Sequence, residues 1–193
     1  DAPGLMPAVD YIKTLRQTDD LGSLAVAKRC IVIGAGNTAI DMATQMARLG
    51  ATDVTLVYRR GVEAMSATDH EQEIAKANGV RMITWAQTDD ILLDSQGRVA
   101  GMRFAKTQEK AGQLTATGDT FEIAADAIFK AIGQGFEGAS LRDATAAELA
   151  RDGERIQVDD MLRTSLPNVY AGGDCVNPGQ DLTVQAVQHG KLA

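Results

Sequence analysis

The chain has 193 residues, of which 45% are hydrophobic and 23% charged, a composition that fits one folded domain with part of a second. Its 19 basic and 26 acidic side chains give a net charge of −7, which disfavours nucleic acid because a phosphate backbone requires a basic face. Two cysteines are too few for a disulfide scaffold or a four-cysteine metal site, and no apolar run reaches the roughly 18 residues of a membrane helix. We expect a cytoplasmic protein with no metal ligands and no nucleic-acid or membrane partner.

The first half of the chain alternates short apolar runs with apolar residues at helical spacing. Continuous apolar runs are typical of parallel strands buried on both faces, and the spacing between them is that of amphipathic helices. The pattern predicts strands at 30–33, 54–58 and 80–85, and helices at 7–17, 38–49 and 70–78. This order predicts an α/β fold with a Rossmann-like, doubly wound parallel sheet. Met65 and Trp85 are expected in its core.

The second half begins with an antiparallel pattern. Apolar runs around a Ser-Gln-Gly turn predict a β-meander, with the polar stretch 108–120 as a long exposed connection. Residues 126–132 then return to the parallel sheet. The remaining elements expected are a weak helix at 144–150, a strand at 155–158 and a helix from about residue 181.

A glycine-rich turn follows the first strand of the sheet directly and opens the next helix. Its residues fit the pattern G-x-G-x-x-G/A: Gly34, Ala35, Gly36, Asn37, Thr38 and Ala39. The first glycine allows the tight turn, the second lets backbone amides approach a pyrophosphate, and the helix N-terminus supplies partial positive charge. At a strand-to-helix turn this pattern predicts dinucleotide binding rather than a glycine turn that only packs.

Two arginines stand about 20 residues further on, where the choice between NAD and NADP is made. NAD-binding proteins carry an acid at the end of the second strand, whereas this chain has Arg59 and Arg60. Two guanidinium groups match a 2′-phosphate through charge-assisted, bidentate hydrogen bonds. The pair predicts NADP(H), with NAD(H) as the open alternative, because adjacent arginines also occur on solvated strand ends and Glu63 is close enough in sequence to pair with one of them.

A second motif lies near the end of the chain, at residues 164–174. It reads Thr-Ser-Leu-Pro-Asn-Val-Tyr-Ala-Gly-Gly-Asp and precedes the last helical pattern. It resembles the C-terminal FAD motif of flavoprotein reductases with two dinucleotide-binding domains. The resemblance implies that Asp174 bonds the ribityl chain, that Gly173 lets the backbone pass close to FAD, and that residues near Thr183 lie by the flavin.

Together these motifs resemble the glutamate synthase small-subunit family, which includes the flavin-containing half of dihydropyrimidine dehydrogenase. The resemblance rests on segments in the right order: 7–16, 34–41, 58–61, 65–66, 70–71 and 131–134. It implies that Ala35 to Thr38 line the pyrophosphate and that Ala131, Ile132 and Gly133 lie by the nicotinamide. Ser66 stands where relatives carry a third basic residue, and some relatives use NADH, so NAD stays open.

The resemblance also implies the domain organisation. Residues 1–21 would be a remnant helix and linker of a FAD domain, 22–136 the NAD(P)H-binding domain, and 137–193 the C-terminal segment of the FAD domain. The glycine fingerprint for FAD and the N-terminal cluster-binding cysteines of complete members are not in this sequence, which also starts without methionine. We therefore expect an excised piece of a longer protein, with FAD bound in the full-length form.

The first hypothesis is that this is the NADPH-binding portion of a flavin-dependent oxidoreductase that passes hydride to FAD, with an iron–sulphur or larger catalytic subunit as the next acceptor. The alternative is a non-catalytic regulatory module that senses NADP(H). Flavin reduction in a longer chain separates them. No catalytic side chain is assigned, because the cofactors carry the chemistry; His70 and His189 are expected to be surface or packing residues. The absence of Cys-x-x-Cys excludes thioredoxin-reductase dithiol chemistry.

The sequence predicts that this chain, purified alone, is colourless. Its single glycine fingerprint is assigned to NADP(H), so only the flavin end of FAD would find contacts, and these must overcome an association cost of several kcal/mol. Absorption spectroscopy after purification with added FAD checks this. Stoichiometric flavin bound to the 193-residue chain would contradict it.

Overall fold

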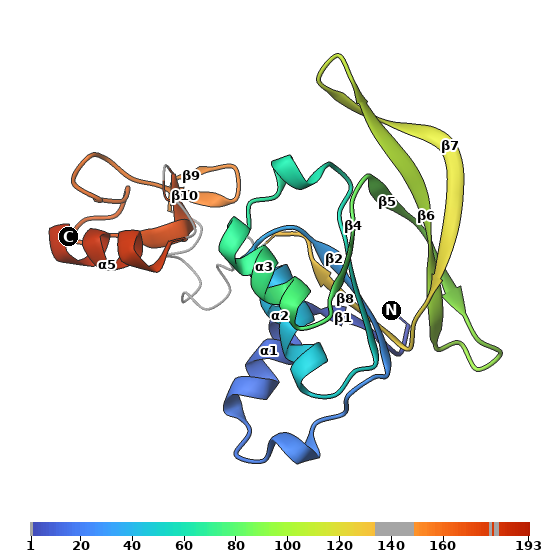
Figure 1. Ribbon diagram of the computed structural model, residues 1–193. Coiled ribbons are helices and arrows are strands. Elements are labelled where there is room, and N and C mark those ends of the chain that lie inside the picture. The colour runs from blue at the N-terminus through green and yellow to red at the C-terminus, as the bar shows by residue number, and fades with distance from the viewer. Residues whose placement is uncertain (1, 134–148, 178, 180–181) are drawn as a thin grey trace. The chain divides into compact units, whose positions relative to one another are not determined.

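The computed structural model in Figure 1 describes residues 2–133, 149–177, 179 and 182–193. The chain forms two compact units, Asp1–Gly133 and Gln134–Ala193. The helix expected at 144–150 falls almost entirely outside the described residues, and its last two positions are not helical. The division into an NAD(P)H domain flanked by two FAD-domain segments stays a prediction.

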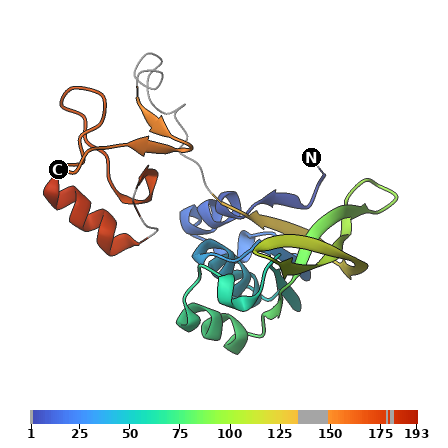
Figure 2. The same cartoon turned by 90° about the horizontal axis from the view of Figure 1, so that it is seen from above.

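A five-stranded, all-parallel sheet forms the centre of the first unit. The strand order is β1-β8-β2-β3-β4, with bounds Leu5–Pro7, Ala127–Ala131, Arg29–Gly34, Asp53–Val57 and Arg81–Ile83. Helices α1 (Ala8–Gln17), α2 (Asn37–Arg48) and α3 (Asp69–Ala77) lie on one face of the sheet, and the antiparallel strands lie on the other (Figures 1 and 2). The predicted α/β fold with a Rossmann-like sheet is confirmed.

The two faces of the sheet bury alternate residues of each strand. On β2, Cys30 and Val32 pack toward the helices, and Ile31 packs toward the antiparallel strands. Phe129 and Ile128 divide in the same way on β8. This period of two explains why the strands read as continuous apolar runs, since both faces are covered.

Strand β1 was not expected from the sequence. It has three residues, pairs only with β8 and leads directly into α1, so its sequence shows neither alternation nor a sustained apolar run. Such a short edge strand forms because β8 offers it a complete partner. The N-terminal segment therefore packs as part of the first unit.

The antiparallel sheet is longer than the sequence indicated. It consists of β5 (Ala86–Leu93), β6 (Val99–Lys110) and β7 (Gln113–Ala124). Residues 108–120 are exposed or half-buried, as expected, but the expectation of a long connection there was wrong, because the β6–β7 ladder continues to Lys110 and Gln113. The tight turn at Ala111 and Gly112 has positive φ at both residues (51° and 78°), and alanine there gives a weaker signal than the usual Asn-Gly. The solvated end of this ribbon has no buried face to produce an apolar pattern.

Two residues expected in the core are only half-buried. Met65 packs at the edge of the helix-side core. Trp85 follows β4 with φ +58°, a left-handed conformation that a bulky residue rarely adopts. Its backbone forms the turn between the two sheets, so its ring does not lie in either core.

The second unit has a small core of its own. A three-stranded sheet is formed by β9 (Arg151–Asp152), β10 (Arg155–Gln157) and β11 (Val176–Asn177). Ile156 of β10 and Val176 of β11 pack with Leu149 to form this core. The strand expected at 155–158 is confirmed. The last helix, α5 (Thr183–Leu192), begins two residues after the predicted start and buries none of its residues among those described.

An ion pair joins the amino ends of two neighbouring strands in the first unit. The Arg29 guanidinium donates to the Asp126 carboxylate, and the Arg29 backbone N–H donates to Asp126 Oδ2 at 3.0 Å. These hydrogen bonds and the positive charge of Arg29 lower the pKa of Asp126 below its usual 3.8. The resulting stabilisation is complete above pH 3.8 and is lost as the pH falls through the lowered pKa.

Replacing Asp126 with asparagine should therefore destabilise the first unit more at neutral than at acid pH. The free energy of unfolding should fall at pH 7, and this deficit should shrink as the pH is lowered below 3.8, because the carboxylate of the unfolded chain is protonated before that of the folded protein. Denaturant unfolding followed by fluorescence of Trp85, the single tryptophan, measures it. Asp89→Asn is the control, because Asp89 is exposed and forms no ion pair among the described residues. An equal deficit at both pH values would contradict this role.

Candidate functional site

Three of the predicted segments meet at the carboxyl edge of the parallel sheet. Strand β2 ends at Gly34, β3 at Val57 and β8 at Ala131. Because all three strands are parallel, the loops that follow them leave the sheet on the same side. Gly34 pairs directly with Ala131. The glycine turn, the arginine pair and the predicted nicotinamide segment therefore lie at one edge.

The two glycines of the turn serve different purposes. Gly34 has φ +150°, and a Cβ there would overlap the Ala131 carbonyl and lie 3.1 Å from Ala39 Cβ. Gly36 has an extended backbone, and among the described residues a Cβ there would meet only Ser66 Oγ, at 3.3 Å. Gly34 is thus required by strand packing, whereas Gly36 leaves open space above the turn.

Helix α2 starts at this open space without a side-chain cap. The Gly36 carbonyl accepts the first helical bonds, from the N–H groups of Ala39 at 2.9 Å and Ile40 at 3.2 Å. Gly36 is the N-cap and offers no side chain to the free amides of the first turn. The side-chain oxygen of Asn37 is buried and has no hydrogen-bond partner among the described residues. The free N–H groups of an uncapped helix N-terminus suit an anionic ligand, whereas the unpartnered Asn37 oxygen, an acceptor, suits a hydroxyl donor.

The arginine loop after β3 is held to the glycine turn. The Ala67 N–H donates to the Ala35 carbonyl at 2.9 Å, and the Tyr58 hydroxyl donates to the Ala64 carbonyl at 3.0 Å, bracing the loop from within. Ser66, which stands where relatives are expected to carry a third basic residue, lies beside Gly36.

Both arginines are free of acidic partners in the part of the chain that is described. Arg59 is exposed, and Arg60 is half-buried with an Nε that has no hydrogen-bond acceptor. Glu63, the candidate partner, lies instead with its carboxylate over Gly61. In a chain of net charge −7, these two guanidinium groups make the end of β3 locally basic.

The segment after β8 presents apolar surface at the same edge. Ala131 is half-buried, Ile132 is 73% exposed, and Gly133 has φ +118°. An isoleucine exposed to this degree leaves a large apolar side chain available to a planar ring.

The Gly-Gly-Asp motif lies in the second unit and packs against α5. A Cβ on Gly172 would lie 2.6 Å from His189 Cβ, and one on Gly173 would lie 3.3 Å from Ala186 Cβ. The Gly173 N–H donates to His189 Nδ1 at 3.0 Å, which accounts for His189 as a packing residue. His70, on α3, is exposed. The glycines therefore allow close approach of a helix, while Asp174 and Thr183 are exposed and available to a ligand.

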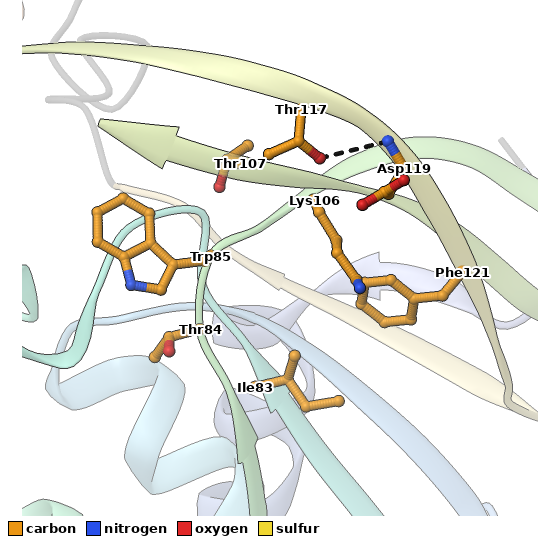
Figure 3. Close-up of a pocket in the computed structure, with 8 residues that line it drawn as sticks. All are labelled: Ile83, Thr84, Trp85, Lys106, Thr107, Thr117, Asp119 and Phe121. Carbon is orange, nitrogen blue, oxygen red and sulfur yellow. Dashed lines mark hydrogen bonds between the residues drawn. The ribbon is translucent and has the colours of Figure 1, made fainter. Parts of the chain in front are cut away.

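A shallow pocket of about 340 Å³ lies between β4 and the antiparallel sheet. Figure 3 shows Trp85 and Thr107 on one side of it and Lys106 beside Phe121 on the other. Its lining includes none of the predicted site residues. Sequence reasoning missed Trp85 and Thr107 as neighbours of the arginine loop, because Thr107 lies 48 residues beyond Arg59 in a strand whose extent was underestimated.

The remaining candidates carry no site chemistry. Burial, helped by the charges of Asp126 and Asp53, raises the pKa of the Cys30 thiol to about 12, so it stays protonated. Within residues 2–133, 149–177, 179 and 182–193, no group of three or more His, Cys, Asp or Glu side chains could hold a metal ion. No described helix is both long and apolar enough to cross a membrane.

Comparison with known proteins gives the family. The sequence pattern of the pyridine nucleotide-disulphide oxidoreductases matches residues 1–190. The chain is 32% identical to the glutamate synthase (NADPH) small chain of Escherichia coli K12, over 86% of this chain and 37% of the relative. It is 33% identical to the beta subunit of the NADP(+)-dependent formate dehydrogenase of Moorella thermoacetica, over 98% of this chain and 27% of that subunit. The chain spans about a third of the length of such relatives.

A solved structure shares the fold. The crystal structure of T. acidophilum thioredoxin reductase matches 98% of this chain and 55% of its own, with a TM-score of 0.73 at 23% identity. The fold is thus that of a Rossmann-like α/β protein. The chain belongs to the pyridine nucleotide-disulphide oxidoreductase family, and the resemblance to the glutamate synthase small subunit is confirmed.

The different roles of the two glycines predict different effects of alanine. Gly34→Ala should lower the free energy of unfolding by roughly 2 kcal/mol or more, because the new Cβ overlaps backbone at a strained φ. Gly36→Ala should change it by less than about 1 kcal/mol, since only the Ser66 hydroxyl must shift. Denaturant unfolding measures both. Equal losses would show that the space above Gly36 is already filled by the fold.

Proposed function

We propose that this chain is the NADP(H)-binding portion of a flavin-dependent oxidoreductase that passes hydride from NADPH to FAD. The observation that carries the proposal is the pair Arg59 and Arg60, which has no acidic partner among the described residues and follows β3 at the sheet edge where α2 starts without a side-chain cap.

The residues present fit the nucleotide. Gly36 leaves room for a pyrophosphate above the turn, and two buried polar atoms, Asn37 Oδ1 and Arg60 Nε, lack partners in the described part of the protein. Buried polar groups are rarely left unsatisfied in a folded protein, so orphans at the same sheet edge support a ligand that bonds them. One orphan accepts and the other donates, which matches a sugar phosphate with both hydroxyl and anionic oxygens.

The protein's own part in the reaction is to bind and orient. The backbone of Ala35 to Thr38 would hold the pyrophosphate, and the guanidinium groups of Arg59 and Arg60 would hold the 2′-phosphate. Ala131, Ile132 and Gly133 would lie along the nicotinamide, where exposed Ile132 offers an apolar surface. The bound cofactors supply the hydride donor and acceptor, so no side chain of this chain needs to act as acid or base.

The second unit carries the proposed FAD contacts. Asp174 would accept hydrogen bonds from the ribityl hydroxyls, with Gly173 and Thr183 beside the flavin. The Asp174 carboxylate is exposed, which leaves it free to do so. Two relatives are named as the small chain of glutamate synthase and the beta subunit of a formate dehydrogenase. A larger catalytic or iron–sulphur subunit as the next electron acceptor is therefore part of the proposal.

Removing the two guanidinium groups should abolish the preference between the two nucleotides. The 193-residue chain should bind NADP+ more tightly than NAD+, and Arg59→Ala with Arg60→Ala should bring the two dissociation constants together, since each charge-assisted bond contributes about 1.5–3 kcal/mol. Isothermal titration calorimetry measures both constants.

Arg16→Ala is the matched control. Arg16 is exposed in the last turn of α1, which ends at the opposite edge of the parallel sheet from the glycine turn. It should leave both dissociation constants unchanged. Equal affinities in the wild-type chain would contradict the NADP assignment. A non-catalytic sensor would show the same preference, and flavin reduction by NADPH in a longer chain would then be missing.

A further inference from the structure

The backbone of the arginine loop is fixed by residues outside it. Three consecutive carbonyls each accept a hydrogen bond: Tyr58 from the Ala86 N–H at 3.0 Å, Arg59 from the Thr107 hydroxyl at 2.6 Å, and Arg60 from the Trp85 N–H at 3.0 Å. The donors are Trp85 in the turn before β5, Ala86 at the start of β5, and Thr107 in β6. The antiparallel sheet therefore holds the main chain from which both guanidinium groups extend.

Thr107 occupies the centre of this arrangement. Its hydroxyl donates to the Arg59 carbonyl, and its backbone N–H donates to the Trp85 carbonyl at 2.9 Å. Thr107 is therefore hydrogen-bonded both to the arginine loop and to Trp85, which itself donates to that loop. The side chain is only 5% exposed. Trp85 keeps a left-handed backbone with φ +58° at this junction, a conformation that persists only where the surroundings impose it.

A register irregularity points Thr107 inward. On β6, the alternation of buried residues passes through Met102 and Phe104 and would next bury Lys106. The β6–β7 pairing shifts between Ala105 and Thr107, and beyond the shift Lys106 is exposed and Thr107 is buried. Bulges of this kind commonly redirect a side chain next to a functional site.

We propose that Thr107 is a positioning residue that sets the nucleotide preference of the arginine pair, through its hydrogen bond to Arg59. The inference rests on the proposed NADP(H)-binding function. It adds that the antiparallel sheet helps to determine the choice between NADP(H) and NAD(H). Arg59 is exposed and forms no ion pair with any described residue, so nothing at the tip of its side chain fixes the guanidinium before the nucleotide binds. Fixing the backbone of Arg59 reduces the conformational entropy that this residue loses when its guanidinium binds a phosphate. NAD+ lacks the 2′-phosphate, so its affinity does not depend on the hydrogen bond from Thr107 to Arg59.

The test replaces Thr107 with valine, which keeps the β-branched shape and removes the hydroxyl. We expect the dissociation constant for NADP+ to rise about fivefold, the effect of one net hydrogen bond, while that for NAD+ changes less than about twofold. Calorimetry measures both, and the fluorescence of Trp85, the only tryptophan, reports the junction itself. Thr107→Ser should restore the wild-type preference, because it returns the hydroxyl. Thr107→Ala is the second variant should valine disturb the fold, with the same expected loss.

Thr115→Val is the matched control. The Thr115 hydroxyl also donates to a backbone carbonyl of this sheet, that of Gln108 at 3.4 Å, but does not contact the arginine loop. It should leave the ratio of the two affinities unchanged. An unchanged ratio in Thr107→Val, or an equal loss for both nucleotides, would overturn the inference.

A double-mutant cycle separates this inference from the function on which it rests. In the Arg59→Ala background, Thr107→Val should have no further effect on the NADP+ affinity, because the side chain that it positions is gone. Additive losses would contradict the positioning role and leave the arginine assignment standing. If Arg59→Ala itself leaves NADP+ binding unchanged, both the assignment and the inference fail.

Discussion

The parallel pairing of β2 with β3 and β8 is the constraint on which the candidate site depends. It directs the three following loops to one edge and sets Gly34 directly against Ala131. Gly34 must be glycine because that pairing leaves no room for a Cβ. With the turn fixed in this way, Gly36 and the start of α2 face open space, and the arginine loop is held beside them through Ala35 and Ala67.

The antiparallel strands, which cover one face of this sheet, have two roles. Met102, Phe104 and Ile123 bury one face of the parallel sheet. At the end of the same sheet, Thr107 hydrogen-bonds the loop that carries the predicted specificity residues. A single element thus contributes core packing along most of its length and main-chain support at one end. This links the stability of the core to the geometry of the arginine pair.

The parallel strands, the helices and the glycine turn could be predicted from the sequence because each has a local signature. Apolar runs such as Cys30 to Ile33 predict strands that are buried on both faces, and the glycine pattern predicts the turn between strand and helix. Strand β1, the full length of β6 and β7, and the place of Thr107 could not be predicted. Each depends on a partner far away in the chain: β8 for β1, and Arg59 for Thr107. The cofactor roles of all the candidate residues stay predictions.

The central claim is that the arginine pair recognises a 2′-phosphate at this sheet edge. The buried Nε of Arg60, which has no partner among the described residues, offers the most direct probe. Nitrogen-15 NMR of the arginine side chains, with the Arg60 signal assigned by its loss in Arg60→Lys, follows this group during titration. The account predicts that NADP+ shifts the Arg60 Nε–H resonance strongly and that NAD+ at matched saturation does not. An equal response to the two nucleotides, or no response to either, would contradict it.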